Sequence, residues 1–343
     1  MTMKSRKIPG TKYIYAPGSS PDNPPPGQYG DIKLISGSTY VPFGQEVSDY
    51  LNIPLCEHEV IKFSNENIFV RLMQSVRGQD VYYIMGMSAP VSDSIMEMLI
   101  TLDALKRDSA GRINVVIPYF SYGRSDKKDQ PRVPITARLL ADMIQVAGAD
   151  RYMAIDLHAP QIQGFFSIPG DALTAFHLIS DYFAEKRLED GVVLSTDLGF
   201  AKRGRNYAAR LDMPLAVVEK RRIGNRDQAE VMSLIGEVAG KAAIVIDDEC
   251  DTGGTLSNAV QVALDNGARE VYVAFTHAVM SGPAIERLTA LPIQEIVTTN
   301  TLPIPAAKIE KLPNLTILSV APLIAEVIKR AHEGRSVGEL FNE

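Results

Sequence analysis

Short apolar segments alternate with longer segments of helical periodicity along most of the chain. The stretch 92–106 carries apolar residues on one face of a helix: Ile95, Met96, Leu99, Leu102 and Leu105. This spacing predicts an amphipathic helix. The segment 114–118 is instead short and largely apolar, which is typical of a strand buried in a sheet. Alternation of the two kinds of segment predicts repeated β-α-β units.

The same alternation continues from residue 32 to residue 320. Further helices are predicted over 44–51 and 135–146. Strands are predicted over 32–36, 68–72, 81–85 and 152–156, and then over 192–195, 216–219, 243–247, 271–275, 296–299 and 316–320. Right-handed crossovers place such strands parallel, with helices on both faces. The predicted fold class is therefore α/β, with two doubly wound parallel sheets.

The length of the chain favours two domains. A chain of 343 residues exceeds the usual single core, and domains of about 150 residues are expected. We place the boundary near residues 172–176, which gives a first domain over 32–174 and a second over 175–330. Residues 1–31 differ from both, because Pro24, Pro25 and Pro26 favour an extended segment that no helix accommodates. They are predicted to form an N-terminal extension.

Composition and charge exclude several classes of function. Apolar residues make up 45% of the chain and charged residues 22%, both ordinary for a globular protein. The balance of 35 basic and 41 acidic residues, a net charge of -6, attracts neither nucleic acid nor an anionic membrane. No apolar run approaches the roughly 20 residues that span a bilayer, and the N-terminus lacks the apolar core of a signal peptide. We expect a cytoplasmic protein with no nucleic-acid or membrane partner.

The segment 243–256 passes from an apolar strand through an acidic turn and a glycine loop into a helix. Asp247 and Asp248 come where the strand must end, which is where ligands bind in a parallel sheet. The loop that follows can surround an anion with N–H and hydroxyl donors beside a helix N-terminus. Its residues are Asp251, Thr252, Gly253, Gly254 and Thr255. The combination suits a phosphate with a polyol attached, although two glycines alone could mark a plain strand-to-helix connection.

Polar segments follow other predicted strands. Residues 119–129 combine aromatic and charged side chains that can stack on a base and pair with phosphates, although a solvated charged loop is the alternative. His158 follows the strand 152–156, where it could ligate a metal, contact a phosphate or be structural. Four cations lie within 220–226, which we predict to be a mobile loop. A basic loop opposite acidic strand ends fits a polyphosphate and a divalent cation between them. The chain lacks the P-loop and dinucleotide fingerprints, so phosphate must be held in another way.

The order and length of these motifs resemble the ribose-phosphate diphosphokinase family, also called phosphoribosyl-pyrophosphate synthetases, from about residue 32 to residue 341. The resemblance covers 117–128, 133–140, 156–166, 197–203, 220–222, 245–255, 276–277, 281–284 and 336–341. It implies two phosphoribosyltransferase-type domains, with a C-terminal helix over 331–343 that returns to the first domain. It also implies transfer of the β,γ-diphosphoryl group of ATP to the 1-hydroxyl of ribose 5-phosphate, with Mg²⁺.

The resemblance implies a role for individual residues. The loop Asp251–Thr255 would hold the 5-phosphate, while the ribose would be bound by Asp247, Asp248 and Asp197. His158 and Asp197 would lie at the magnesium, and Lys220, Arg222 and His158 would be catalytic. The ATP-binding residues would be Phe63, Asn65, Asn67, Arg124, Ser125, Asp126 and His158. A regulatory site for phosphate or ADP would include Ser75, Arg77 and Arg132.

The chain departs from the family pattern at several of these positions. Asn67 stands where the family usually has a carboxylate, and Ser125 replaces a glutamine, both on the nucleotide side. Thr196 replaces a proline, and Phe200 replaces a glycine beside the sugar, where its ring could close the pocket or stack on an added group. The resemblance further implies dimers assembled into hexamers, in which a neighbour's Phe63 segment completes the nucleotide site.

Three other functions remain open at this stage. The acceptor could be a larger ribose phosphate such as ADP-ribose, because Phe200 and Asn67 alter binding surfaces. The protein could be a catalytically silent regulatory homologue, although it retains His158, Asp197 and Lys220. A phosphoribosyltransferase that shares only the loop would not explain two domains or the Arg124 motif.

Overall fold

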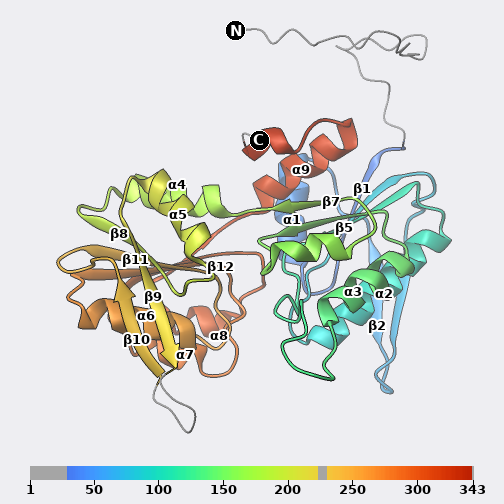
Figure 1. Cartoon of the computed structure of the whole chain (residues 1–343). Helices are drawn as coiled ribbons and strands as arrows, with labels where there is room; N and C mark the ends of the chain where they lie inside the picture. The colour runs from blue at the N-terminus through green and yellow to red at the C-terminus, as the bar shows by residue number, and fades with distance from the viewer. Residues whose placement is uncertain (1–28, 223–229, 342–343) are drawn as a thin grey trace, which may run out of the picture.

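The computed structural model describes residues 29–222 and 230–341 and contains two parallel sheets side by side (Figure 1). We refer to residues 29–175 with 320–341 as the first lobe and to residues 176–319 as the second lobe. The five strands of the first sheet lie in the order β1-β4-β5-β6-β7. Their bounds are β1 Ile32–Ser36, β4 Asp80–Ile84, β5 Arg112–Ile117, β6 Arg151–Ile155 and β7 Gly170–Leu173.

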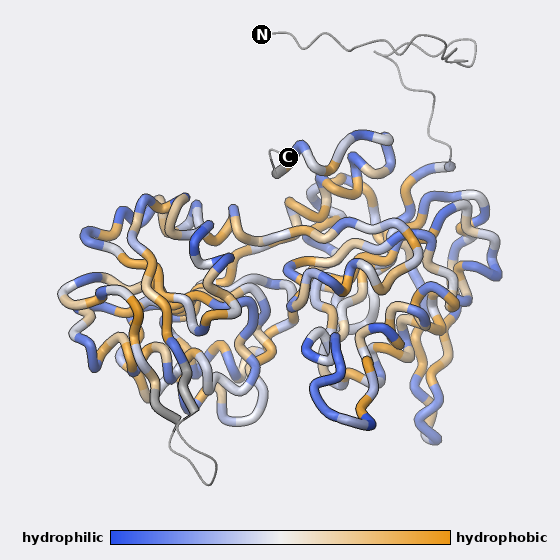
Figure 2. The backbone as a smooth tube through the Cα atoms, viewed as in Figure 1, coloured by the Kyte–Doolittle hydropathy of each residue, from blue (hydrophilic) through white to orange (hydrophobic). Residues whose placement is uncertain are grey.

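Helices cover both faces of the first sheet, so its strands are apolar on both sides. All five residues of β4 are buried, as expected for a central parallel strand. Figure 2 shows hydrophobic residues concentrated along the strands and hydrophilic ones in the loops. The helices are α1 Val41–Leu51, α2 Val91–Arg107, α3 Thr136–Ala147 and the 3-10 helix η1 Pro160–Phe165. Helices α2 and α3 contact each other, while α1 contacts α9, Ala321–Glu333.

The second sheet has seven strands in the order β10-β9-β8-β11-β12-β13-β14. Their bounds are β8 Gly191–Ser195, β9 Leu215–Arg222, β10 Glu230–Ile235, β11 Ala242–Glu249, β12 Glu270–His277, β13 Ile293–Thr299 and β14 Leu315–Leu318. Its helices are α4 Phe176–Lys186, α5 Ala201–Leu211, α6 Gly254–Asp265, α7 Ala284–Thr289 and α8 Ala306–Ile309. The chain turns outward from β8 to β9 and resumes on the other side at β11. The carboxyl ends of β8 and β11 therefore flank the position at which doubly wound sheets bind ligands.

The sequence analysis missed strands β2, β7 and β10. Strand β2 His58–Lys62 forms an antiparallel hairpin with β3 Ile68–Leu72, which was predicted at these bounds, and β10 pairs antiparallel with β9. Strand β7 has four residues, of which only Leu173 is buried, and the ring of Tyr152 lies so close that a Cβ on Gly170 would be 2.0 Å from it. Periodicity cannot find such strands because hairpin and edge strands are held by pairing as much as by burial. The predicted doubly wound parallel sheets are confirmed, with β10 and the hairpin as antiparallel additions.

The helix that returns to the first lobe was predicted at the wrong position. It is α9, Ala321–Glu333, and only the 3-10 helix η2 Gly338–Phe341 lies beyond it, so the prediction of a helix over 331–343 was wrong. Proline in the first turn suits a helix start at Ala321. Gly334, with φ 69, supplies the left-handed residue that ends the helix. The predicted strand 316–320 is correspondingly shorter, because Val320 is already the N-cap of α9.

The predicted domain boundary near residues 172–176 falls between β7 and α4. The predicted N-terminal extension lies almost entirely outside the described residues. Of the helices in the described ranges, none combines the length and the apolar character needed to cross a bilayer.

Candidate active site

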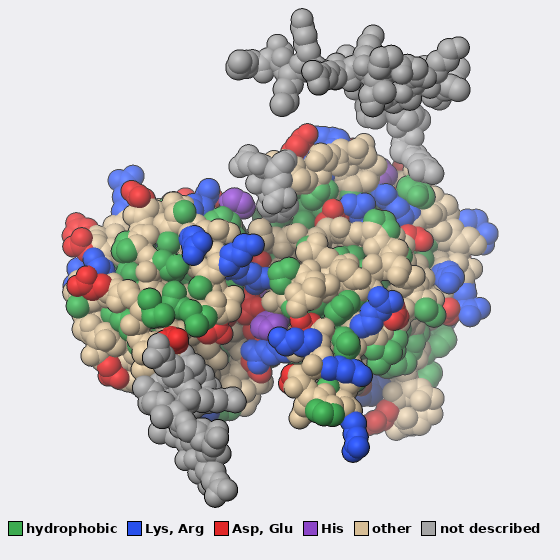
Figure 3. Space-filling view, viewed as in Figure 1, with side chains coloured by type: hydrophobic (Ala, Val, Ile, Leu, Met, Phe, Trp, Pro, Cys, Tyr) green, Lys and Arg blue, Asp and Glu red, His purple; other side chains and the backbone are tan. Residues whose placement is uncertain are grey.

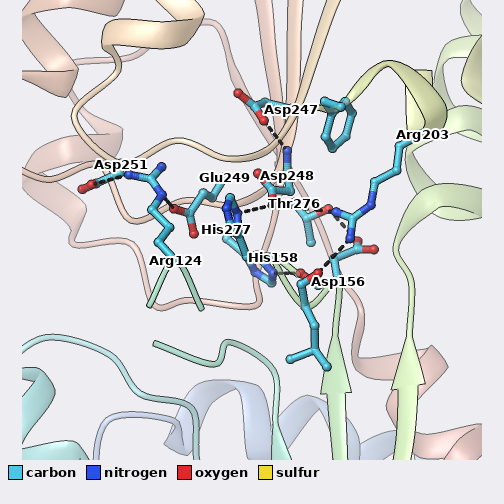
Figure 4. Close-up of polar contacts among 12 residues, drawn as sticks. Arg124, Asp156, His158, Arg203, Asp247, Asp248, Glu249, Asp251, Thr276 and His277 are labelled. Atoms are coloured by element: carbon cyan, nitrogen blue, oxygen red, sulfur yellow. Dashed lines mark hydrogen bonds and ion pairs between the residues drawn. The ribbon is translucent and has the colours of Figure 1, made fainter. Parts of the chain in front are cut away.

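The carboxyl end of β11 places three acidic residues where the two lobes meet. Asp247, Asp248 and Glu249 are the last three residues of the strand, and Asp248 and Glu249 are buried. Figure 3 shows basic, acidic and histidine side chains gathered in this region, and Figure 4 shows the residues in detail. The three carboxylates have different partners, so each has a different electrostatic environment.

Asp248 forms an ion pair with His158 across the lobes. Nδ1 of His158 donates to Oδ2 of Asp248 at 2.7 Å, and Nη1 of Arg203 lies 3.7 Å from the same oxygen. The hydrogen bond with Asp248 raises the pKa of His158, so the imidazolium is favoured. Burial tends to raise the pKa of Asp248, but His158 outweighs it and the pKa is lowered overall. Asp248 is therefore held as a carboxylate.

Asp247 behaves in the opposite way. Its Oδ2 accepts the hydroxyl of Thr196 at 2.9 Å, and its Oδ1 accepts the N–H of Asp248 at 2.9 Å. Burial and then the negative charge of Asp248 raise the pKa of Asp247 well above its ordinary value. Two adjacent carboxyls thus differ in protonation, because two like charges in contact do not both ionise easily. Such a pair can both donate to and accept from the hydroxyls of a sugar.

The predicted phosphate loop has the geometry of an anion site. Gly253 has φ 74, and α6 begins at Gly254 without a side-chain cap among the described residues. The first-turn N–H groups of a helix have no acceptor within the helix and favour an anion. Asp251 does not line the loop as a free carboxylate, because the hydroxyl of Ser281 and Arg124 both donate to it. The structure brings this loop next to the acidic end of β11, as the sequence order requires.

Arg124 reaches the phosphate loop from the first lobe. Its Nε lies 2.6 Å from Oε1 of Glu249, and its Nη1 lies 3.2 Å from Oδ2 of Asp251. A cavity of about 370 Å³ opens beside Arg124 and is also lined by Tyr122 and Lys127. The 119–129 segment thus combines basic side chains with an aromatic ring at the mouth of the site.

The other two residues predicted beside Arg124 hold the segment in shape. The Oγ of Ser125 accepts the N–H of Thr136 at 3.2 Å at the start of α3. Asp126 is buried, and its carboxylate accepts from the side chain of Gln161. Ser125 and Asp126 therefore already have partners within the chain, whereas Arg124, Lys127 and Lys128 are the exposed cations of the segment.

A second cavity, of about 470 Å³, adjoins Asp247 and Asp248. Phe200, Arg203 and Tyr207 line it from the second lobe, and Asp156 lines it from the first. The ring of Phe200 lies 5.6 Å from the guanidinium of Arg203. The sequence left open whether the ring of Phe200 closes the pocket or stacks on an added group. In the structure the ring forms part of the wall of this cavity and contacts the guanidinium of Arg203.

Asp197 and His158, the two residues predicted at the magnesium, share no described contact. Asp197 is exposed, and its Oδ1 accepts the N–H of Phe200 at 2.8 Å, just before α5. No described hydrogen bond or ion pair joins it to His158. Among the described residues, no group of three or more His, Cys, Asp and Glu side chains is placed so that it could hold a metal ion.

The predicted adenine-side residues lie on the turn of the β2–β3 hairpin. Phe63, Asn65 and Asn67 are all exposed, and the N–H of Phe63 donates to the carbonyl of Asn67 at 2.9 Å. The described contacts of this turn are with the hairpin itself and, through Lys62, with Asp93 of α2. The structure therefore does not join these residues to Arg124 within one chain.

The remaining predicted residues lie elsewhere. Ser75 and Arg77 lie on an exposed turn before β4, and Arg132 is exposed with φ 66. Lys220 and Arg222 were predicted on a loop, but their backbone belongs to β9, which continues through Arg222 and pairs with β10. Their side chains, and residues 223–229 of the predicted mobile loop, lie outside the described part of the chain.

The sequence analysis did not single out two residues that organise the site. Glu249 was passed over as one acid among three. Asp156 has φ 41, and its carboxylate accepts from the hydroxyls of Thr174 and Thr276, both at 2.7 Å, which joins the two lobes directly before His158. A non-glycine residue with positive φ is uncommon and is often found where the fold fixes a functional segment.

The fold and the site define a doubly wound α/β protein in which a glycine loop at a helix start faces a basic segment. Comparison with known proteins agrees. Residues 32–148 match the family model for the N-terminal domain of ribose phosphate pyrophosphokinase, and residues 225–342 match the phosphoribosyl synthetase-associated domain. The chain therefore belongs to the ribose-phosphate pyrophosphokinase family.

Individual relatives match over nearly their whole length. The ribose-phosphate pyrophosphokinase of Caldanaerobacter subterraneus is 48% identical over 311 residues, which is 90% of this chain and 98% of the relative. That of Bacillus subtilis is 46% identical over 317 residues, 92% of this chain and 99% of the relative. The crystal structure of phosphoribosylpyrophosphate synthetase from Mycobacterium smegmatis superposes with a TM-score of 0.84 at 40% identity, over 89% of this chain and 99% of that one.

Proposed function

We propose that this chain is a ribose-phosphate diphosphokinase, which transfers the diphosphoryl group of ATP to the 1-hydroxyl of ribose 5-phosphate. The products are 5-phosphoribosyl 1-diphosphate and AMP. The observation that carries the proposal is the contact of Arg124, from the first lobe, with Glu249 and Asp251 at the acidic strand end and phosphate loop of the second lobe. A basic group for a nucleotide and a loop for a sugar phosphate thus face each other.

The sugar phosphate is bound at the carboxyl end of β11. The N–H groups of the loop Asp251–Thr255 and the start of α6 hold the 5-phosphate. Asp248, kept ionised by His158, accepts a hydrogen bond from a ribose hydroxyl, and Asp247 can donate one. This arrangement orients the sugar before the chemical step, and orientation supplies much of the rate of phosphoryl transfer.

ATP lies along Arg124 and His158, and the Phe63 segment of a neighbouring protomer contacts its adenine. The exposed hairpin turn has no described contact with Arg124, which supports donation between protomers. On the family resemblance and the sequence, dimers assembled into hexamers and a cytoplasmic location are proposed as well. Ser75, Arg77 and Arg132 are proposed, on the resemblance alone, to bind a regulatory anion.

The described residues fit Mg²⁺ carried by the nucleotide. Mg²⁺ usually keeps several waters and takes one or two protein ligands beside substrate phosphates, so a complete protein cage is not needed. His158 and Asp197 are the residues proposed to hold it. His158 would bind through Nε2, which requires loss of the Nε2 proton while Nδ1–H stays on Asp248. Asp197 is exposed, with its Oδ1 shared with one N–H. When bound, Mg²⁺ neutralises charge on the phosphate oxygens. The chain itself orients the two substrates, and Lys220 and Arg222 are proposed to stabilise charge on the group that moves.

The decisive experiment identifies the products by mass. The protein is incubated with Mg²⁺, ATP and either ribose 5-phosphate or ADP-ribose. We expect 5-phosphoribosyl 1-diphosphate and AMP with ribose 5-phosphate. Preference for ADP-ribose would instead favour the larger acceptor, for which the cavity lined by Phe200 beside Asp247 offers room. No product with either acceptor would leave the silent regulatory homologue as the better description.

A further inference from the structure

Glu249 is a buried acid for which the proposed reaction has no role. It ends β11, and only 7% of its side chain is exposed. A buried carboxylate is tolerated only when it is paired. Its described side-chain partners both come from the first lobe: Nε of Arg124 at 2.6 Å from Oε1, and the hydroxyl of Tyr119, which donates to Oε2 at 3.4 Å. Glu249 therefore faces across the boundary between the lobes.

The exposed side chain of Arg124 needs a partner to hold it in one orientation. It is 55% exposed, on a turn closed by the N–H of Ser125 and the carbonyl of Tyr122 at 2.9 Å. A long exposed side chain samples many rotamers, and an anion that binds it must first overcome that loss of entropy. Contacts that fix the guanidinium beforehand reduce this entropic penalty.

The two carboxylates that contact Arg124 are not equivalent. Asp251 is 33% exposed, lies 3.2 Å from Nη1 and also accepts from Ser281. Glu249 is nearly fully buried and lies 2.6 Å from Nε. A phosphate that binds the guanidinium competes for its Nη groups. It can replace Asp251 there, while the shorter and more buried contact of Glu249 remains on Nε.

Tyr119 supports the same arrangement. Burial, and then the charge of Glu249, raise the pKa of Tyr119, so its hydroxyl stays protonated and can donate to Glu249. The ring of Tyr119 lies 4.9 Å from that of His277, which is opposite Glu249 in the register of β11 and β12. Each oxygen of the Glu249 carboxylate thus has its own partner, Oε1 in Arg124 and Oε2 in Tyr119.

We propose that Glu249 is a positioning residue that holds Arg124 across the lobes in the orientation that binds the polyphosphate of the nucleotide. The inference rests on the proposed function, because it assigns the anion at Arg124 to ATP. Glu249 touches neither substrate in this scheme. It acts through Arg124 alone, and this property can be tested.

The test compares Glu249→Gln with a matched control. The isosteric change removes the charge but keeps the size of the side chain. We expect the KM for ATP to rise roughly three- to tenfold, the range set by freeing one long side chain, with the KM for ribose 5-phosphate unchanged. Glu270 provides the control, because it also contacts an arginine Nε, 3.2 Å away on Arg269, and a tyrosine hydroxyl, 2.9 Å away on Tyr272, but at the opposite end of the sheet. Glu270→Gln should leave both KM values unchanged.

A double-mutant cycle decides whether the effect passes through Arg124. In an Arg124→Ala background, Glu249→Gln should raise the KM for ATP no further. Assays are run below the melting temperature of every variant, and Glu249→Asp, which keeps the charge, should restore part of the ATP affinity. An unchanged KM for ATP in Glu249→Gln, or an equal rise with and without Arg124, would overturn the inference. Loss of the proposed function would instead appear as absence of product from the wild-type protein.

Discussion

The paired acids of β11 show how one residue's contacts determine its neighbour's charge. Asp248 is ionised because His158 donates to it, and burial together with this charge raises the pKa of Asp247. The next residue, Glu249, has its own cation in Arg124. Three consecutive acids can therefore coexist at one strand end, because two have cations from the first lobe and the third is favoured as the neutral form.

Gly253 allows a prediction at this scale. Its φ of 74 disfavours any side chain, and an added Cβ would lie 3.2 Å from Ala284. Gly253→Ala should raise the KM for ribose 5-phosphate at least tenfold, because the loop N–H groups are displaced from the phosphate. Gly240, with φ 71 and nothing within 4 Å of an added Cβ, is the matched control for backbone strain.

Both alanine variants should lose about 1 kcal/mol of unfolding free energy, measured by urea titration. Steady-state kinetics then separates them, because only the Gly253 variant should bind ribose 5-phosphate more weakly. Equal KM values in the two variants would remove the loop from the phosphate site.

At the scale of elements, how well the sequence predicted each segment depended on burial. Central strands such as β4 and β11 were predicted within two residues of their bounds, because burial on both faces requires apolar runs. Strands β2, β7 and β10 were not predicted, since pairing with neighbouring strands determines them as much as burial does, whereas β3 was predicted at its observed bounds. The contact of Glu249 with Arg124 joins positions that are distant in sequence, and it could not be predicted because it depends on how the lobes pack.

The proposed catalytic cations Lys220 and Arg222 lie on strand β9 and not on a loop, but the effect that we expect from replacing them is the same. We predict that Lys220→Ala and Arg222→Ala lower kcat about a hundredfold, on the order of 3 kcal/mol, with little change in either KM. The physical reason is that each cation would contact the charge that develops on the transferred diphosphoryl group, and this charge is present only in the transition state. Kinetics on folded variants, with the exposed Lys311→Ala as control, measures this. A large rise in KM with kcat preserved would mean that these residues only recruit ATP.

The hairpin β2–β3 gives a second prediction at the element scale. The ring of Phe63 is 49% exposed, so Phe63→Ala should leave stability nearly unchanged but raise the KM for ATP roughly tenfold, through loss of stacking on the base. Tyr50→Ala, with a ring on α1 that is 58% exposed, is the control. If neighbours share a site, mixing Phe63→Ala with Arg124→Ala protomers at an ATP concentration below the KM of both variants should give more activity than the sum of the two measured separately. Additive activities after mixing and re-equilibration would place the whole nucleotide site in one protomer.

For the whole molecule, a buried polar cluster joins α9 to the first sheet. Asp80 is fully buried and accepts from Arg112, whose Nη2 lies 2.6 Å away, and from Nδ1 of His332 at 2.8 Å. Arg112 also donates to the carbonyl of Ala331 at 3.2 Å. Burial tends to raise the pKa of Asp80, but Arg112 and His332 outweigh it and the pKa is lowered. The end of α9 is therefore held by an ionised carboxylate.

Asp80→Asn should lower the unfolding free energy by on the order of 3 kcal/mol near neutral pH, because Arg112 loses its buried partner. Since the folded pKa lies below the unfolded value of about 3.9, this stabilisation is complete above about pH 4 and is lost as the pH falls further. Urea titrations between pH 3 and pH 7 measure the difference. Asp103→Asn, which breaks the exposed pair with Arg107, should cost less than about 1 kcal/mol. A difference between wild type and Asp80→Asn that persists unchanged at pH 3 would contradict the assignment.

The return of α9 to the first lobe also determines when that lobe can finish folding. Helix α1 packs against α9, whose buried face consists of Ala321, Ile324, Ala325, Val327, Ile328 and Ala331. During synthesis the strands of the first sheet leave the ribosome long before this face exists. The apolar side of α1 therefore stays exposed to solvent while the whole second lobe is translated. A nascent chain of this protein is thus most vulnerable to aggregation, and most in need of a chaperone, in the interval that ends when residue 333 emerges.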